Sequence, residues 1–153
     1  ATGAQLVTLS ASMRVNWTFT PTLSLQMYVQ PLISAGEYTN FKELARPSTY
    51  EFNRYGDGSS TFDDVNYIAD PDGNGPSPGL SLGNPDFNFK SIRGNAVLRW
   101  EYFPGSTVYF VWTQTRSDVE NIGDFQFRQS MTRLFDATPD NIFLVKLSYW
   151  WSL

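Results

Sequence analysis

The sequence predicts an all-β fold, namely an antiparallel up-and-down transmembrane β-barrel segment of about five long strands. Three observations predict it. Apolar and polar residues alternate over long stretches, which indicates strands with one apolar and one polar face. Short turns alternate with long connections along the chain. The charged residues of the expected strands fall on the polar faces, as lipid contact on the other face requires.

The composition excludes many functional classes. The chain has 153 residues with no Cys and no His, which excludes disulfides, Cys–zinc sites, thiol nucleophiles and imidazole bases. Its 11 basic and 15 acidic residues give a net charge of −4, so no nucleic-acid partner is expected. No apolar run approaches the roughly 18 residues of a membrane-spanning helix. This does not exclude a membrane β-barrel, because its strands alternate apolar and polar residues.

The first predicted strand covers residues 7–19, and the second begins at Leu23. Thr20, Pro21 and Thr22 supply the turn between them. A three-residue turn brings the two apolar faces together. The resulting pairs are Phe19–Leu23, Trp17–Leu25, Val15–Met27 and Arg14–Tyr28.

The third and fourth strands form a second hairpin around Phe103, Pro104 and Gly105. A three-residue turn keeps the polar faces together, whereas a two-residue turn would reverse the faces of the fourth strand. We favour the first register, with the pairs Trp100–Val108, Leu98–Phe110, Ala96–Trp112, Arg99–Tyr109 and Asn95–Thr113. The last predicted strand runs from Phe143 to Leu153.

Two long connections, residues 34–87 and 117–140, are expected to be external loops. In the first, segments 49–55 and 61–68 are expected to pair as an outlying ribbon. The second contains apolar residues at helical spacing, which predict one short amphipathic helix ending before Pro139. These residues are Phe127, Met131, Leu134 and Phe135.

The two faces of the strands carry different residue types. Aromatic residues gather beside the short turns, as expected at a membrane–water boundary. They are Trp17, Phe19, Trp100, Tyr102, Tyr149 and Trp151. The predicted lumen-facing residues are Arg14, Arg93, Arg99, Glu101 and Lys146. These charges either line an aqueous lumen or pair with residues of further strands.

The expected partners follow from the strand number. About five strands cannot close a barrel, because the smallest single-chain barrels have about eight. Open edges in lipid would leave backbone groups without hydrogen bonds. The predicted partners are therefore the lipid bilayer and the remaining barrel strands, from the same parent chain or from other copies. Ala1 in place of Met fits a removed signal or a piece of a larger protein.

Three segments carry a resemblance to a known family: PDFNFKSIRGNAVLRWEYFPGS at 85–106, DNIFLVKLSYWW at 140–151 and FKELARP at 41–47. They resemble the C-terminal barrel region of bacterial outer-membrane proteins of unknown function that carry an N-terminal family-9-type carbohydrate-binding module. The resemblance covers nearly the whole chain. It implies a barrel in the bacterial outer membrane of a Gram-negative-type envelope, but no established activity. It assigns sugar binding to no residue of this sequence.

The end of the chain carries a second resemblance. Alternate residues counted back from Leu153 are apolar or aromatic, namely Trp151, Tyr149, Leu147 and Val145. This spacing is similar to the barrel-assembly signal of outer-membrane proteins. The sequence departs from that signal at its last position, where Leu stands in place of Phe or Trp.

The candidate metal site is a calcium site in the turn that contains Asp70, Asp72 and Asn74. Their spacing matches the first three oxygen ligands of a calcium loop. Ser81 stands where such a loop has its bidentate Glu, so a complete EF-hand is excluded. The alternative interpretation is a solvated acidic turn. No other cofactor is expected.

No enzymatic activity is expected. The remaining carboxylate pairs, Asp118 with Glu120 and Asp136 with Asp140, fall in expected loops with no base or nucleophile beside them. The predicted function is therefore structural or transport-related, a porin-like pore or a scaffold for surface loops. The alternative is a soluble β-sandwich module that binds carbohydrate through exposed aromatic residues.

Overall fold

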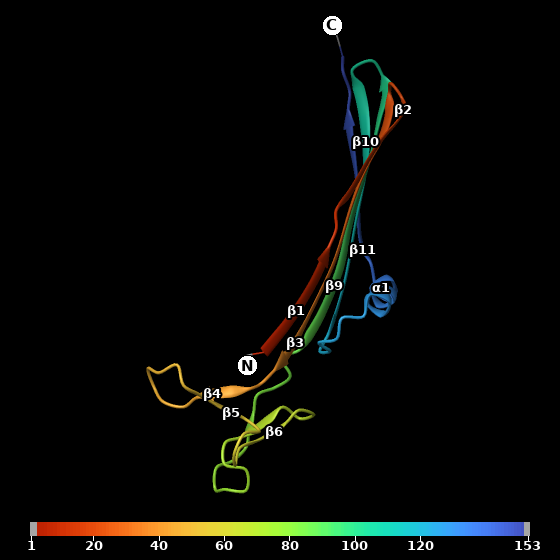
Figure 1. The fold of residues 1–153 in the computed structure, drawn as a ribbon. Coiled ribbons are helices and arrows are strands. Elements are labelled where there is room, and N and C mark those ends of the chain that lie inside the picture. Colours follow the sequence, from red (N-terminus) through yellow and green to blue (C-terminus); the bar gives the residue numbers. More distant parts are fainter. Residues whose placement is uncertain (1–2, 152–153) are drawn as a thin grey trace. The chain divides into compact units, whose positions relative to one another are not determined.

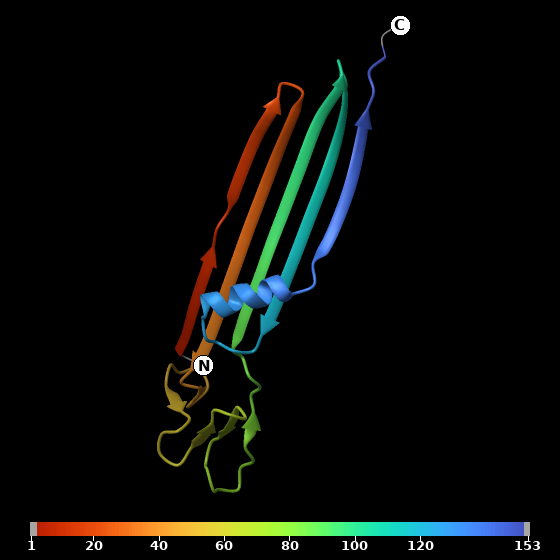
Figure 2. The ribbon, with the colours of Figure 1, turned by 90° about the vertical axis from the view of Figure 1, so that its right-hand side faces the viewer.

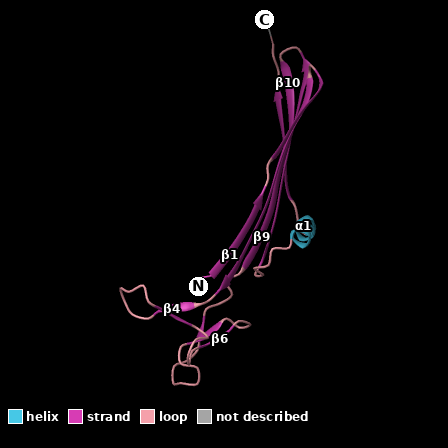
Figure 3. Ribbon diagram, in the orientation of Figure 1, coloured by secondary structure: helices cyan, strands magenta, loops and turns pink. Residues whose placement is uncertain are grey.

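The computed structural model describes residues 3–151, and in this part the chain is all-β and antiparallel with one short helix. The elements in chain order are β1 (Gly3–Ser10), β2 (Met13–Thr20), β3 (Leu23–Thr39), β4 (Lys42–Leu44), β5 (Phe52–Arg54), β6 (Thr61–Asp63), β7 (Ile68–Asp70), β8 (Leu80–Ser81), β9 (Phe87–Phe103), β10 (Ser106–Glu120), α1 (Phe127–Asp136) and β11 (Asp140–Ser148). Figure 3 shows α1 as the single helix among the described strands. The expected fold class is confirmed to this extent.

The long strands form one sheet of six strands. Its order is β1-β3-β9-β10-β11, and β2 also pairs with β3 (Figures 1 and 2). Two short turns, one between β2 and β3 and one between β9 and β10, join neighbouring strands at the same end (Figure 2). The sheet therefore has the up-and-down connectivity that the alternation of turns and loops predicted.

The first predicted strand is divided into β1 and β2 because its pairing is interrupted opposite Pro31. The Ala11 N–H donates a hydrogen bond of 3.2 Å to the Pro31 carbonyl. In an antiparallel pair the partner residue returns this bond, but proline has no N–H to donate. Residues 11 and 12 therefore belong to neither strand, and the sheet gains one strand over the expected number.

The predicted register of the first hairpin is confirmed except at its tip. Arg14 pairs with Tyr28, Val15 with Met27 and Trp17 with Leu25. The expected pair of Phe19 with Leu23 is wrong, because Leu23 faces Thr20 and a bulge lies between Thr18 and Thr20. The extra residue of a bulge opposes no partner of its own, and here it shortens the turn to Pro21 and Thr22.

The second hairpin contains a side-chain bond that agrees with its predicted register. The Asn95 side-chain amide donates a hydrogen bond of 3.0 Å to the Thr113 hydroxyl, and these two residues were expected to face each other. On the far side of β10, β11 pairs in register from Thr107 with Ser148 to Thr115 with Asp140.

The last strand lies earlier in the chain than predicted. It begins at Asp140 and ends at Ser148, whereas residues 149–151 continue without strand structure. The reason is that β10 begins at Ser106, one residue before the Thr107–Ser148 pair, and offers little backbone beyond it. The Trp150 N–H instead donates a hydrogen bond of 3.0 Å to the Ser106 hydroxyl. Leu153 lies outside the described residues.

The two long connections are shorter than expected because the strands are longer. They comprise residues 40–86 and 121–139, in place of 34–87 and 117–140. The expected ribbon of segments 49–55 and 61–68 is wrong: β5 pairs with β4, and β6 pairs with β7, which also pairs with β8. The Asp63 carboxylate accepts hydrogen bonds from the N–H groups of Val65 and Asn66, which closes the β6–β7 turn locally.

The predicted helix is present as α1. Ser130 and Leu134 are its buried residues, and Phe127 and Phe135 remain about half exposed. The helix ends where the Ala137 N–H donates to the Arg133 carbonyl, two residues before Pro139.

The described chain divides into two compact units. Unit 1 comprises residues 3–7, 34–88 and 120–125, including the two small sheets, and its buried apolar residues are Ala35, Phe41 and Ala69. Unit 2 comprises residues 8–33, 89–119 and 126–151, including most of the large sheet and α1. Its buried apolar residues are Ile33, Val108 and Leu134. A chain of this length usually buries a larger apolar core than these two sets.

Candidate functional site

One face of the sheet in unit 2 exposes an extensive apolar surface, here called the apolar face. It carries the alternate strand residues Met13, Val15, Trp17, Phe19, Met27, Trp100, Tyr102, Phe110, Trp112, Phe143, Val145 and Leu147, all of which are exposed. Trp17 is 60 % exposed and Phe143 75 % exposed. Soluble monomers rarely leave such large apolar groups together in water.

Four of the six predicted interface aromatics lie on the apolar face, and the other two lie in the chain after β11. Trp17 stacks on Phe19 with ring centroids 5.9 Å apart, and Trp100 meets Tyr102 edge to face at 6.2 Å. Both pairs lie in the last residues before or beside a short turn. Tyr149 and Trp151 are exposed as well, but they lie after the end of β11.

Charged residues on the apolar face lie toward the ends of β9 and β10 that are remote from the short turns. Alternation along β9 and β10 places Lys90, Arg116 and Asp118 on this face. Lys90 is completely buried, and its ammonium lies 3.1 Å from the Asp118 carboxylate. The Arg116 guanidinium donates a hydrogen bond to the Phe135 carbonyl in the last turn of α1. Asp118, which was expected in a loop, is therefore part of β10 and paired.

The helix α1 crosses the sheet (Figure 2), and the bond between Arg116 and Phe135 places it on the apolar face. Phe127 and Met131 of α1 line a crevice of about 190 Å³ together with Leu9, Ala11, Pro31, Leu32 and Ile33. No polar group contributes to the surface of this crevice. The helix thus packs on the sheet through apolar contacts.

The opposite face of the sheet, here called the polar face, carries the predicted lumen-facing charges. Arg14 lies 5.8 Å from the centre of the Tyr28 ring, a cation–π distance. These two residues line a cleft of about 290 Å³ with Asn16, Gln26, Met27, Asn95 and Val97. Arg93 and Lys146 are exposed, and Lys146 faces Tyr109 across the β10–β11 pair.

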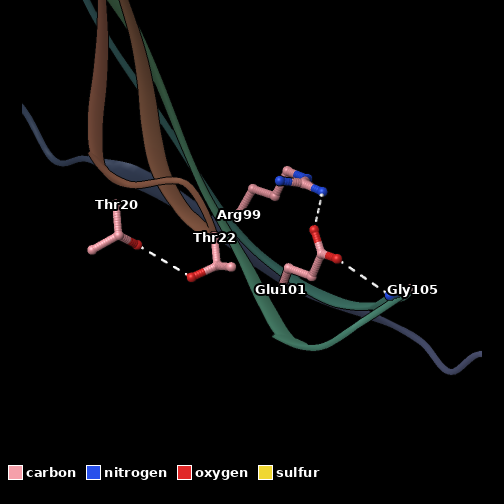
Figure 4. Close-up of polar contacts among 5 residues, drawn as sticks. All are labelled: Thr20, Thr22, Arg99, Glu101 and Gly105. Carbon is pink, nitrogen blue, oxygen red and sulfur yellow. Dashed lines mark hydrogen bonds and ion pairs between the residues drawn. The ribbon is translucent and has the colours of Figure 1, made fainter.

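Arg99 and Glu101 form a local network at the short-turn end (Figure 4). The Arg99 guanidinium donates a hydrogen bond of 3.1 Å to one Glu101 oxygen, and the Gly105 N–H donates one of 3.2 Å to the other. Thr20 and Thr22, in the neighbouring turn, share a hydrogen bond of 3.2 Å between their hydroxyls. Four cations (Arg14, Arg93, Arg99 and Lys146) and Glu101 are thus distributed over the polar face.

The predicted calcium ligands lie at the end of β7 and in the turn that follows it, and one carboxylate oxygen of Asp70 and one of Asp72 are engaged with the backbone. One Asp70 oxygen accepts hydrogen bonds from the N–H groups of Asp72 and Gly73. One Asp72 oxygen accepts the Ser77 N–H at 3.1 Å, which lowers the pKa of Asp72. Within residues 3–151, no three His, Cys, Asp or Glu residues are close enough to hold a metal ion. The calcium site stays a prediction.

Unit 1 contains a cleft that sequence reasoning missed. It has a volume of about 380 Å³ and is lined by Glu37, Tyr38, Thr39, Asn40, Phe41, Tyr55, Phe62, Asp64, Tyr67 and Asp86. Tyr67 donates a hydrogen bond of 2.7 Å to Asp86, and that bond, with burial, raises the pKa of Tyr67 to about 12. The available signal was the succession of aromatic and acidic residues between positions 55 and 89, a stretch without Lys or Arg.

Among residues 3–151, α1 is too short to be a membrane-spanning helix, and no other helix occurs there.

Comparison with known proteins identifies a family. No curated protein and no solved structure matches the chain. The family model described as domain of unknown function (DUF5916) matches residues 3–152, which is nearly the whole length. This protein therefore belongs to the DUF5916 family.

Proposed function

We propose that the chain is part of an outer-membrane β-barrel and acts as a structural or transport component, either a pore or a scaffold for surface loops. The observation that carries this proposal is the apolar face of unit 2. Large apolar side chains alternate along long antiparallel strands and are exposed there. A lipid-facing barrel wall has this pattern, with aromatic residues toward the membrane–water boundary.

The distribution of charge supports the same proposal. A charge facing lipid at mid-bilayer costs roughly 2–4 kcal/mol, and less near the interface. The charged residues of the apolar face lie near the strand ends that are remote from the short turns. Lys90 and Asp118 form an ion pair, and Arg116 donates a hydrogen bond to α1. The strand residues between them and the short turns are uncharged on this face.

In this proposal α1 lies at the membrane interface. Amphipathic helices settle there with the apolar side toward the acyl chains and basic residues toward the headgroups. α1 directs Met131 and Leu134 toward the sheet, while Arg128 and Phe135 are exposed. The exposed Phe127 and Phe135 would then contact lipid beside the headgroup layer.

The open edges of the sheet define the partner. At one edge is β11, and at the other are β1 and β2, which both pair with β3; each of these has a neighbour on one side only among the described strands. Six strands are fewer than the roughly eight of the smallest single-chain barrels, so further strands must pair with both edges in lipid. Those strands come either from the same parent chain or from other copies.

The polar face supports a pore as one form of this function. The four cations Arg14, Arg93, Arg99 and Lys146 outnumber the two acidic residues on the strands of this face, Glu101 and Asp140. Charges that line a lumen select ions of opposite sign, so a pore built with this wall would favour anions.

The alternative is a soluble β-sandwich module that binds carbohydrate. A second sheet could cover the apolar face, and exposed Trp and Tyr rings could stack on sugars. The abundance of exposed rings at the end of the chain, Tyr149, Trp150 and Trp151, favours this alternative.

The deciding experiment uses the protein at its full natural length. We expect it to fractionate with outer membranes, to need detergent, and to migrate differently on gels with and without boiling. Lipids brominated in the acyl chains should quench its tryptophan fluorescence in vesicles. A soluble, unquenched protein would contradict the proposal and favour the sandwich. The intact mass separates the two sources of further strands, because 17.4 kDa alone requires several copies.

A further inference from the structure

The cleft in unit 1 has walls built from aromatic rings, here called the aromatic cleft. Phe41 stacks on Phe62 with ring centroids 4.5 Å apart. Tyr67 meets both rings edge to face, at 6.1 Å from Phe41 and 6.3 Å from Phe62. Tyr55 lines the same cleft. Phe41 is buried, whereas Tyr55, Phe62 and Tyr67 retain partly exposed surface, so ring area is available to a ligand.

The charge in the aromatic cleft has one sign. Glu37, Asp64 and Asp86 line it, and no Lys or Arg does. Asp64 and Glu37 lie close enough to Tyr67 for their charges to help raise the pKa of its phenol, after the larger effects of Asp86 and burial. The cleft therefore has a negative potential in addition to its ring surfaces.

These groups do not have the arrangement of a metal site. No three carboxylates of the described chain stand close enough to share a metal ion. An organic cation is larger and is less strongly hydrated than a metal ion. It gains from several ring faces and from carboxylates at longer distance. A volume of about 380 Å³ is within the range of small-molecule sites.

We propose that the aromatic cleft binds a small organic ammonium group, held against the rings of Tyr55, Phe62 and Tyr67 and neutralised by Asp64 and Glu37. Asp86 acts as a positioning residue. Its two oxygens accept hydrogen bonds from the Tyr67 hydroxyl at 2.7 Å and from the Tyr38 N–H at 2.8 Å, which fixes the Tyr67 ring at the cleft. A neutral sugar could stack on the same rings and donate hydroxyl hydrogen bonds to the carboxylates, but it would lack the attraction between opposite charges that a cation gains there.

This proposal is independent of the barrel. All residues of the cleft belong to unit 1, so their chemistry does not depend on what covers the apolar face. If the cleft does not bind ammonium, the proposal of a barrel still stands. If the protein is soluble but binds ammonium, the ammonium site is supported and the barrel is contradicted.

The experiment measures the binding of choline by titration calorimetry to the full chain. A polyoxyethylene detergent and sodium phosphate buffer avoid competing sugars and amines. The comparison ligand is 3,3-dimethylbutan-1-ol, which replaces the nitrogen of choline by carbon and keeps the shape. We expect saturable choline binding and at least about tenfold weaker binding of the neutral alcohol, since the alcohol loses both the cation–π attraction and the attraction to the carboxylates.

Two variants test the residues. Asp64 is exposed, so Asp64→Asn removes a charge from the cleft with little effect on folding, and we expect choline affinity to fall several-fold. The matched control is Asp57→Asn, which removes the same charge from the same acidic stretch at a residue outside the cleft and should leave affinity unchanged. Phe62→Leu keeps an apolar residue but removes a ring, and it should weaken choline more than the alcohol.

Three results would overturn the proposal. The first is absence of choline binding by a chain whose circular dichroism is that of a folded protein. The second is equal affinity for choline and the neutral alcohol, which would show an apolar site without charge recognition. The third is binding of glucose or cellobiose in place of choline, which would show a sugar site.

Discussion

Lys90 is completely buried, and its ammonium lies 3.1 Å from the Asp118 carboxylate on the neighbouring strand β10. Asp118 retains 31 % of its side-chain exposure, so the pair sits at the margin of the packed region. Removal of a carboxylate beside a completely buried ammonium weakens the compensation of the ammonium charge, which costs more than the pair contributes. The stability of this end of the sheet should therefore depend strongly on Asp118.

We expect Asp118→Asn to lower the free energy of unfolding by about 3 kcal/mol, toward the low end of the range for broken buried pairs because Asp118 is partly exposed. The double variant Lys90→Met with Asp118→Leu should recover most of this loss, since it removes both charges. Urea unfolding followed by circular dichroism measures both. A single variant as stable as the wild type would mean that Asp118 does not carry the compensation of the Lys90 charge.

Gly105 should tolerate no larger residue. Its φ of +77° is a left-handed conformation, and an added Cβ would lie 3.0 Å from the Trp150 Cβ. The conformation alone costs an L-residue about 1–2 kcal/mol, and the contact adds to it. Gly83→Ala is the matched control, because Gly83 has a φ of +70° and open space around it. In urea unfolding, Gly105→Ala should lower the free energy of unfolding more than Gly83→Ala does. Equal losses would show that the contact with Trp150 adds no cost.

The stability of unit 1 should decrease at high pH because of Tyr67. The hydrogen bond to Asp86 raises the pKa of Tyr67 from 10.0 to about 12, so folding favours the protonated phenol. Its contribution is therefore complete below pH 10 and is lost as the pH rises from 10 to about 12. The difference in phenolate absorbance between wild type and Tyr67→Phe measures this titration. Asp86→Asn should shift it toward 10, and an unshifted titration would contradict the bond.

The period of two was sufficient to predict the strands and most of their register. Trp17 faces Leu25 as expected, since one buried or lipid-facing side fixes the register of a strand. The bulge at Phe19 could not be predicted, because a single extra residue beside a turn leaves the pattern before it intact. The division of the first strand could have been predicted, because Pro31 in the second strand lacks the N–H that pairing with Ala11 requires.

The sites depend on contacts that the sequence does not encode locally. The rings of Phe41, Phe62 and Tyr67 meet although they come from different segments of a connection without periodicity. Asp118 falls in the expected loop of residues 117–140, yet β10 continues to Glu120. The packing of α1 on the apolar face likewise required the structure, because a helical period gives the apolar side of a helix but not its partner.

If the proposed barrel forms a pore, its polar face should set its selectivity. Arg99→Gln combined with Lys146→Gln removes two of the four cations on the strands of this face. In planar bilayers under a salt gradient, the reversal potential should shift toward cation preference, and the anion-to-cation permeability ratio should fall several-fold. Lys42→Gln, in β4 of unit 1, is the control. An unchanged ratio would indicate that these charges pair with residues of the further strands.

Neighbouring residues of β2 should contact different media. Val15 lies on the apolar face and Asn16 on the polar face, next to each other in mid-strand. The chain contains no Cys, so Val15→Cys and Asn16→Cys each give a single attachment site for a spin label. In vesicles of the full-length protein, we expect the label at Val15 to collide more often with oxygen, which concentrates in hydrocarbon. The label at Asn16 should collide more often with a water-soluble nickel chelate. A sandwich would instead shield position 15 from both reagents, because protein and not lipid would cover the apolar face.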